Sequence, residues 1–379
     1  MNNFLTGPRW TIVRSVLQYS FLFMKSLFQL LSLPLFLMLL SCGGKPNTEQ
    51  SANDFSAKID SLIQTTSPRT FNGVILITQK GKTQYEKAFG FANIEEKTPI
   101  SLKDNFRIQS NSKQITAVLT LKELEKGNID LQTPIRKYLP DFSQSWADTV
   151  TVHQLLNMSS GIINTAQPLQ FLPGQGYRYS NAAYGLLGEI IESVSGTTYI
   201  ELANALFEEL EMKNSYCYEL GKENPGLIDA YRVDGTQFNK VLFDSLGITE
   251  AGWKSFIPAG GIISNAYDLN LWDQKLHNGE VLSAESYQLM TSYDNMGQHN
   301  AFGSEPVGYG YGLRIDDKSG VKHLGHAGRG IGFASLKFYV PESEVDVIVL
   351  ENVYNEDTEI VYHFEKAIRD IILKSSLVN

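Results

Sequence analysis

The spacing of apolar residues predicts a helix followed by a hairpin at the start of the folded region. Residues 54–64 (DFSAKIDSLIQ) place apolar side chains at helical spacing, and residues 73–93 (GVILITQKGKTQYEKAFGFAN) read as two strands around a turn at 80–82. After residue 110, the segment KQITAVLTLKELEKG is apolar almost all round in its first half, and Gly127 is placed to end it. This pattern predicts a buried helix.

The rest of the chain divides into a helical region and a strand-rich region. Residues 128–290 are helical and loop-rich, with the clearest helices at 182–196 and 266–279. Consecutive strands with short turns are then expected at 309–316, 322–328, 332–341 and 345–352, before an amphipathic helix over 357–376. Strands at both ends enclose a helical insert. We therefore predict an α+β fold, in which one antiparallel β-sheet is flanked by N- and C-terminal helices and carries a mostly helical inserted subdomain.

The first 42 residues differ in kind from the rest of the chain. A basic start at Lys25, an apolar run over 27–40 and the sequence LLSC ending at Cys42 resemble a bacterial lipoprotein signal, in which the cysteine is lipidated. The alternative is an uncleaved anchor with an incidental cysteine. We expect a signal peptide over 1–41, with 1–23 an over-extended start, then a polar tether over 42–53 and the folded domain over 54–375. The implied location is the cell envelope, lipid-anchored to a bacterial membrane and facing the periplasm or the surface.

Composition limits the possible partners. The chain has 379 residues, is 42% hydrophobic and carries a formal net charge of −9, so it offers no basic surface for nucleic acid. Only two cysteines exist, Cys42 and Cys217. A lipid on Cys42 leaves Cys217 without a partner in the chain, and the fold must then be stable without an internal disulfide.

A serine and a lysine three residues apart form the first chemical candidate. In FRIQSNSKQITA, Ser110 and Lys113 share one face of a helix, so the amine can take the proton that makes a serine hydroxyl a poor nucleophile. The same S-x-x-K spacing recurs at Ser319 and Lys322, in a polar turn with no helix to align the two side chains. Ser110 instead precedes a buried helix, whose free N–H groups favour negative charge on the oxygen.

A tyrosine and an asparagine form the second candidate. In YRYSNAAYG, Tyr179 can relay a proton to a leaving group, and the Asn181 amide can hold both Lys113 and a substrate carbonyl. Tyr293 and Asn295 have the same spacing but sit in a polar loop, whereas Tyr179 follows a loop that enters a helix.

A histidine and a glycine form the third candidate. In HLGHAGRGIGF, Gly328 lets a substrate backbone approach a strand closely, and His326 can hydrogen-bond the serine side of the site. A metal site at His323 and His326 is disfavoured, because no carboxylate or cysteine cluster completes it. The spacing is not unique, since two other pairs match it: His277 with Gly279, at a helix end, and His323 with Gly325.

The order of these motifs along the chain and the sequences that flank them are more specific than any single motif. Together they resemble the serine β-lactamase and penicillin-binding-protein-like superfamily, specifically the class C β-lactamase-related branch that includes carboxypeptidases and esterases, over about residues 55–375. Further matching stretches are FNGVILITQKGK, KAFGFANIEEKTPI, TVHQLLNMSSGI, PGQGYRYSNAAYGLLGEII, PAGGIISNAYDLNLW and YGYGLRI.

The resemblance implies a role for each motif residue. Ser110 would be the acylated nucleophile, Lys113 its base and Tyr179 the proton relay, while Asn181 would bind substrate and the lysine. The strand motif would be His326 to Gly328, and backbone N–H groups of Ser110 and Arg329 would form the oxyanion hole.

Three departures from the family pattern concern the pocket. Gln109 replaces the small residue usual before the serine, NMSSG at 157–161 replaces a histidine-threonine-serine-glycine run, and His326 stands where penicillin binders generally have lysine.

The expectation is therefore an exported, lipid-anchored serine hydrolase that acts on an ester or amide through an acyl-enzyme, with no metal and no cofactor. D-alanyl-D-alanine-type carboxypeptidase, esterase and D-amino-acid amidase activities are not separable, and β-lactamase action is expected to be weak. The alternative from another class is a non-catalytic module that keeps the fold and binds a ligand or the cell wall.

Overall fold

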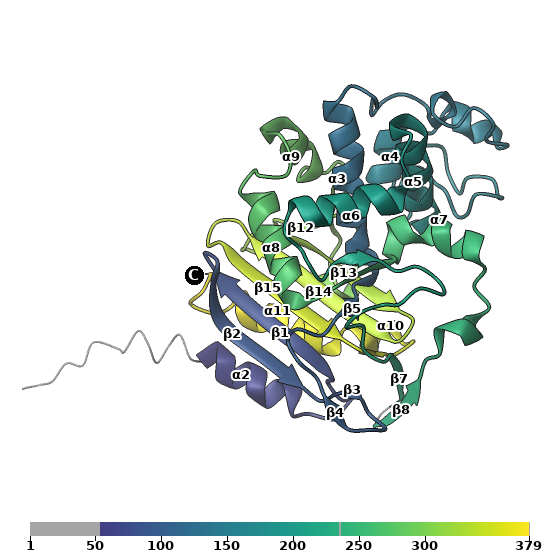
Figure 1. The fold of residues 1–379 in the computed structure, drawn as a ribbon. Coiled ribbons are helices and arrows are strands. Elements are labelled where there is room, and N and C mark those ends of the chain that lie inside the picture. The colour runs from purple at the N-terminus through teal and green to yellow at the C-terminus, as the bar shows by residue number, and fades with distance from the viewer. Residues whose placement is uncertain (1–53, 235, 379) are drawn as a thin grey trace, which may run out of the picture. The chain divides into compact units, whose positions relative to one another are not determined.

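One eight-stranded antiparallel sheet organises the described residues, which are 54–234 and 236–378 of this computed structural model (Figure 1). The expected signal peptide, the Cys42 lipidation site and the tether over 42–53 lie outside the described residues. In sheet order the strands are β10 (Met296–Gly297), β11 (Val307–Tyr309), β12 (Arg314–Asp316), β13 (His323–Gly330), β14 (Phe333–Val340), β15 (Val345–Glu351), β1 (Gly73–Gln79) and β2 (Lys82–Phe89).

The sheet joins the two ends of the chain, as the sequence predicted. Strand β1 pairs with β15 in register from Gly73 opposite Glu351 to Gln79 opposite Val345. In Figure 1 the purple β1–β2 hairpin therefore lies beside the yellow strands of the C-terminal region. The prediction of an antiparallel sheet assembled from both ends is confirmed.

Both faces of the sheet are covered, which explains why β1 and β15 are apolar almost throughout. Alternate residues such as Ile75 and Val349 pack on one side with the terminal helices α2 (Asp54–Ile63) and α11 (His363–Ile372). Their neighbours, such as Leu76 and Ile348, pack on the other side with the inserted helices. Residues His326 and Gly328 of β13 face this second side, because Ala327 between them packs on the first side with the terminal helices.

The insert is largely helical but also contains short strands, so the prediction of a helical region was incomplete. Its helices are α3 (Ser112–Glu125), α4 (Val152–Leu156), α5 (Asn181–Ser195), α6 (Tyr199–Glu209), α7 (Glu250–Gly260), α8 (Ala266–His277) and α9 (Ala284–Met290). Short strands form two three-stranded sheets, β5 (Phe106–Arg107), β9 (Ile262–Ser264) and β6 (Tyr216–Cys217), and β16 (Val353–Tyr354), β7 (Tyr231–Asp234) and β8 (Gln237–Lys240). A further pair is β3 (Phe91–Asn93) with β4 (Thr98–Pro99).

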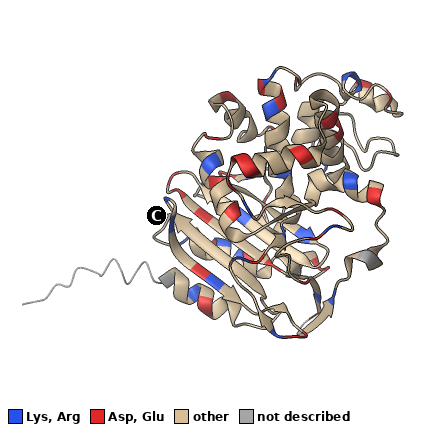
Figure 2. Cartoon of the chain, viewed as in Figure 1, with Lys and Arg blue, Asp and Glu red and all other residues tan. Residues whose placement is uncertain are grey.

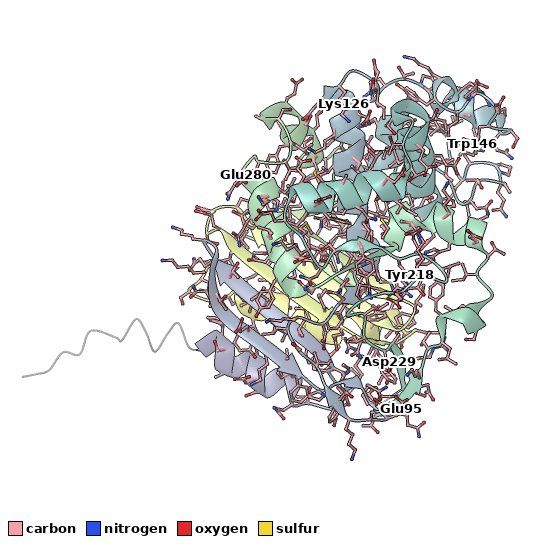
Figure 3. The ribbon with its side chains drawn as sticks, in the orientation of Figure 1. Glu95, Lys126, Trp146, Tyr218, Asp229 and Glu280 are labelled. Atoms are coloured by element: carbon pink, nitrogen blue, oxygen red, sulfur yellow. The ribbon has the colours of Figure 1, made fainter. Side chains whose placement is uncertain are left out.

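The sheet of β16, β7 and β8 connects the insert to the C-terminal strands. Tyr231 in β7 is fully buried, and its hydroxyl donates to the carboxylate of Glu95, which Figure 3 labels beside Asp229 in this region. Strands β7 and β8 have only four residues each. Burial alternates along β7, and β8 is largely exposed. Strands this short carry too few residues for a pattern of alternation to predict them.

Two predicted elements are interrupted. The single strand expected over 309–316 was wrong, because β11 ends at Tyr309 and β12 begins at Arg314. Between them Gly312 has φ +69°, and a Cβ there would lie 2.6 Å from the Lys113 carbonyl oxygen, so this turn packs against the start of α3. The C-terminal helix is likewise two helices, α10 (Thr358–Val361) and α11, which are separated at Tyr362.

Among residues 54–234 and 236–378, every helix is too short or too polar to cross a membrane. Figure 2 shows Lys and Arg interspersed with Asp and Glu over helices and sheet. Acidic residues outnumber basic ones by 41 to 32 in the full sequence.

Candidate active site

Ser110 lies where a short 3₁₀ turn, η1 (Gln109–Asn111), leads into α3. The side chains of the first helical turn, Ser112 to Thr116, are buried, whereas Ser110 is partly exposed. Gln109 has φ +52°, a left-handed conformation that is strained for a residue with a side chain. Its amide nitrogen donates to the Gly330 carbonyl at 2.7 Å, and this bond ties the turn to β13. The serine is thus held at the accessible end of a buried helix.

Lys113 is fully buried and reaches back to the serine. Its Nζ lies 3.2 Å from Ser110 Oγ, 2.8 Å from Asn181 Oδ1 and 2.7 Å from the Ala259 carbonyl oxygen. Burial lowers the pKa of the Lys113 ammonium well below its usual value, and the positive charge of Arg314 lowers it further. A neutral amine has two N–H groups, which the two carbonyl oxygens accept, and its one lone pair then faces the Ser110 hydroxyl. This is the geometry of a general base.

Tyr179 and Asn181 reach the same centre from the loop that enters α5. The hydroxyl of Ser180 caps the helix by accepting from the Ala183 N–H at 3.1 Å, which fixes the residues on either side of it. The Tyr179 ring centroid lies 4.9 Å from Lys113 Nζ. Burial raises the pKa of the Tyr179 phenol, and a hydrogen bond with Ser110 lowers it in part. Ser110, Lys113, Tyr179 and Asn181 therefore meet, although they come from two separate stretches of the chain.

His326 lies beside this group with both ring nitrogens occupied. Its Nδ1 bonds the Ala327 carbonyl oxygen at 2.6 Å, and the Tyr309 hydroxyl lies 3.1 Å from its Nε2. A carbonyl oxygen only accepts, so Nδ1 carries the proton and Nε2 accepts from Tyr309. Burial, and then the charge of Arg314, lower the pKa of the imidazole well below its usual value. His326 is therefore neutral. The sequence had led us to expect a hydrogen bond from His326 to the serine side of the site, but the imidazole bonds Tyr309 instead.

The second half of β13 leaves one strand edge open beside the serine. Strand β12 pairs only with residues 323–325 of β13, so residues 326–330 have no partner from β12. A Cβ on Gly328 would lie 2.6 Å from the Ile108 carbonyl oxygen and 2.8 Å from the Ser110 nitrogen, so only glycine fits here. Arg329 follows directly with an exposed side chain. The backbone nitrogens expected to form the oxyanion hole lie at the same end of the site.

Arg314 and Tyr309 are two site residues to which the sequence reasoning assigned no role. Arg314 is 2% exposed, and its guanidinium carbon lies 5.6 Å from the Tyr179 ring centroid and 5.4 Å from that of Tyr309. Both residues belong to the stretch YGYGLRI, which supported the family resemblance only as a whole. The sequence feature that could have indicated Arg314 is an arginine among tyrosines in an apolar segment. Its position in the site follows only from the turn at Gly312.

One departure from the family pattern, the NMSSG run at 157–161, contacts the site indirectly. Met158, in the NMSSG run, has φ +63°, and its sulfur accepts from the Ser180 backbone N–H at 3.2 Å. Asn157 bonds Ser159 Oγ at 2.6 Å and Asp294 at 2.8 Å. This run therefore supports the loop that carries Tyr179 and Asn181.

The other residues with the same motif spacings, namely Ser319, Tyr293 and His277, lie outside the cluster around Ser110. The Ser319 N–H donates to Asp316 in a turn, and the Tyr293 hydroxyl donates to Asp317 on the surface. His277, expected only to end a helix, is buried against Asp273 at 3.6 Å and stacked on Tyr339. Within the part of the chain that the structure describes, no three His, Cys, Asp or Glu residues form a group that could hold a metal ion.

Comparison with known proteins identifies the family. The β-lactamase family matches residues 59–367. Penicillin-binding protein 4* of Bacillus subtilis is 26% identical over 339 residues, which cover 80% of this chain and 72% of that protein. The octameric penicillin-binding protein homologue from Pyrococcus abyssi superposes with a TM-score of 0.71 at 26% identity, over 85% of this chain and 78% of that one. D-amino acid amidase from Ochrobactrum anthropi superposes with a TM-score of 0.69 at 24% identity, over 84% and 96%. The chain therefore belongs to the β-lactamase family of serine hydrolases.

Proposed function

We propose that this protein hydrolyses an uncharged ester or amide through an acyl-enzyme on Ser110, with Lys113 as the base. The observation that carries this proposal is the position of Lys113 Nζ, which is buried, held by two carbonyl oxygens and 3.2 Å from Ser110 Oγ. A lysine kept only for stability would need a carboxylate beside it when so deeply buried.

The reaction follows from the contacts. Lys113 takes the Ser110 proton as Oγ attacks the substrate carbonyl, and the N–H groups of Ser110 and Arg329 stabilise the oxyanion. Tyr179 carries the proton from Lys113 to the leaving group, whose departure leaves an ester on Ser110. Water then attacks this ester with the same residues taking the proton and returning it to Ser110 Oγ. Asn181 orients Lys113 and is placed to bind the substrate carbonyl.

His326 provides no positive charge for a substrate group next to β13. A lysine at position 326 would present a cation to a substrate carboxylate, whereas His326 is buried and neutral. We infer that esterase or D-amino-acid amidase activity exceeds carboxypeptidase activity on D-alanyl-D-alanine peptides, and that β-lactam hydrolysis is weak. A D-amino acid amidase is among the proteins that share this fold, which supports amide hydrolysis as a candidate activity. The motif order further supports placement in the class C β-lactamase-related branch.

We further propose that the mature chain begins at Cys42, which carries the lipid that anchors it to the outside of a bacterial membrane. The support is the sequence LLSC after an apolar run. Cys42→Ser removes the thiol that accepts the lipid, so the variant should leave the membrane fraction or keep its signal. Fatty-acid labelling that persists in Cys42→Ser would contradict this anchor.

The alternative is a non-catalytic module with the same fold. It is less well supported, because a pure binding site has no need of a lysine lone pair directed at a serine. Turnover of a p-nitrophenyl ester, a D-amino-acid amide, a D-alanyl-D-alanine peptide and a penicillin by the wild type separates the two. A binding module turns over none of them.

Two serine variants test the mechanism with a matched control. Ser110→Ala should abolish turnover of every substrate that the wild type hydrolyses, while Ser319→Ala, at the other S-x-x-K spacing, should leave the rates unchanged. Circular dichroism should show both variants folded. Retained turnover in folded Ser110→Ala would overturn the proposed function.

A further inference from the structure

Arg314 is a buried cation without an anionic partner. Its side chain is almost fully buried, and among the described residues its hydrogen bonds go to a backbone carbonyl and a tyrosine hydroxyl, with no ion pair to a carboxylate. Its hydrogen bonds are long, 3.5 Å from Nη1 to the Gly297 carbonyl and 3.4 Å from Nη2 to the Tyr177 hydroxyl, and Nε has no partner. Burying an unpaired charge is costly, so a cation kept in this position requires an explanation beyond packing.

The guanidinium lies against the aromatic rings of the catalytic centre. Its carbon is 5.6 Å from the Tyr179 ring centroid, and the same ring lies 4.9 Å from Lys113 Nζ. One tyrosine ring thus contacts the proposed base and a permanently charged arginine. The other ionisable groups that interact with Tyr179 or share its ring cluster are Tyr177 and Tyr184 from the same stretch of chain, and Tyr309, His326 and Tyr362 from elsewhere.

These neighbours do not compensate the charge of Arg314. Burial raises the pKa of the tyrosine phenols and lowers that of the His326 imidazole, so all of them are neutral near pH 7. Arg314 is then the fixed charge that Lys113 experiences from this cluster. A second positive charge on Lys113 is disfavoured in the same low-dielectric region.

We propose that Arg314 is a positioning residue that keeps Lys113 unprotonated, so that the amine can accept the Ser110 proton. The role rests on the proposed function, because it presumes that Lys113 is the base. Arg314 itself exchanges no proton. Its permanent charge, seated on the Tyr179 ring, acts through space on Lys113 and favours the proton-accepting state of Tyr179.

The expected consequence is a shift along the pH axis. Loss of the Arg314 charge removes one of the two causes that lower the pKa of Lys113, so this pKa rises. Lys113 must be neutral to act as a base, and the acidic limb of the acylation rate should therefore move to higher pH. We expect a shift of about one pH unit, which is about a tenfold lower rate at any pH on that limb.

The test measures the rate at which an uncharged alkyl fluorophosphonate inactivates the full-length enzyme across the pH range. This probe phosphonylates Ser110 and releases fluoride, so neither binding of a substrate carboxylate nor ionisation of an organic product affects the limb. Arg314→Gln, which removes the charge, should shift the acidic limb to higher pH. Arg314→Lys, which keeps a charge, should return the limb most of the way to its wild-type position. Arg314→Met retains the apolar stem and replaces the glutamine variant if that variant does not fold.

Arg107→Gln is the matched control. Arg107 is also buried against aromatic rings, with its guanidinium carbon 3.7 Å from the ring centroid of Tyr218, which Figure 3 labels. Its Nη1 also lacks a partner, but its charge is not among the causes that lower the pKa of Lys113. This variant should lower thermal stability and leave the acidic limb in place.

The outcomes separate this inference from the proposed function. An acidic limb that stays unchanged in folded, reactive Arg314→Gln overturns the role of Arg314 and leaves the Ser110 mechanism intact. The same holds if Arg314→Gln changes only KM for carboxylated substrates, because Arg314 would then bind substrate. Failure of the proposed function has a different result, namely probe labelling that survives in Ser110→Ala.

Discussion

Gly328 lies so close to Ser110 that a Cβ on the glycine would be 2.8 Å from the serine backbone nitrogen. Real Cβ atoms do not approach backbone so closely. Strand β13 is held by its ladder with β14, and the turn before α3 is tied to β13 by the bond from Gln109 to the Gly330 carbonyl. Gly328→Ala should therefore displace the Ser110 N–H and lower kcat/KM by on the order of a hundredfold, as expected for a lost oxyanion donor. Steady-state kinetics on the preferred ester measures this loss.

Gly196→Ala provides the comparison for the glycine change. Gly196 ends α5 with φ +70°, and a Cβ there would meet no atom within 4 Å. This substitution costs about 1 kcal/mol through backbone conformation and should not change kcat. Normal kinetics in Gly328→Ala would show that β13 does not form part of the oxyanion site.

Tyr179→Phe should reduce turnover far more than stability. The variant keeps the ring that contacts Lys113, Tyr309 and His326 but removes the hydroxyl that bonds Ser110. We expect kcat to fall by about 10² to 10⁴, the range for a positioned proton-transfer group, with little change in melting temperature. A large drop in melting temperature together with normal turnover of the surviving protein would assign Tyr179 a structural role.

His326→Lys should move substrate preference toward carboxylates. The wild-type imidazole is neutral and bonds Tyr309, whereas a lysine at this strand position places an ammonium beside the substrate edge of β13. The ratio of kcat/KM for a carboxylated substrate over its neutral analogue should rise by about tenfold, as one added charge-assisted contact provides. An unchanged ratio would mean that residue 326 does not set the charge preference.

His323 should make the fold less stable in acid. Burial, and then the charge of Arg369, lower the pKa of the imidazole from 6.5 to about 4. Between those values the unfolded chain takes up a proton that the folded protein does not, so the free energy of unfolding falls as pH decreases from about 6.5 to about 4. This one group contributes about 3 kcal/mol of that loss.

Urea unfolding of the wild type and of His323→Gln across this pH window tests the assignment. The glutamine carbonyl can still accept from Arg369 Nε, which lies 2.9 Å from His323 Nε2. In the variant, the slope of the free energy of unfolding against pH should be smaller by the amount that corresponds to the uptake of about one proton. Equal slopes for the two proteins would contradict the buried neutral state of His323.

The long apolar segments could be predicted from sequence because their periodicity matches their burial. Strands β1 and β15 are apolar on both faces since helices cover both sides. Helix α3 is buried as predicted, although polar residues such as Lys113, Gln114 and Thr116 are among its buried side chains. The interruptions could not be predicted in the same way. The turn at Gly312 depends on close contact with the Lys113 carbonyl, and this contact exists only after α3 has packed against the sheet.

In the candidate site too, the local contacts could be predicted from sequence and the long-range contacts could not. Ser110 and Lys113 are one helical turn apart, so their contact follows from local geometry. Their meeting with Tyr179 and His326 depends on tertiary structure, and only the family resemblance predicted it. Arg314 was missed, because an arginine among the tyrosines of YGYGLRI indicates a buried cation only once the turn at Gly312 is known.

The roles of Ser110 as nucleophile and Lys113 as base are tested most directly by the mass of the intact protein after exposure to the fluorophosphonate, followed by peptide mapping of the adduct. We predict one added phosphonyl group, located on Ser110, in the wild type and in Ser319→Ala, and none in Ser110→Ala. Lys113→Met should acquire the same adduct at least about a hundredfold more slowly, because the base is missing. An adduct on another residue, or labelling of Ser110 at the wild-type rate in Lys113→Met, would contradict these roles.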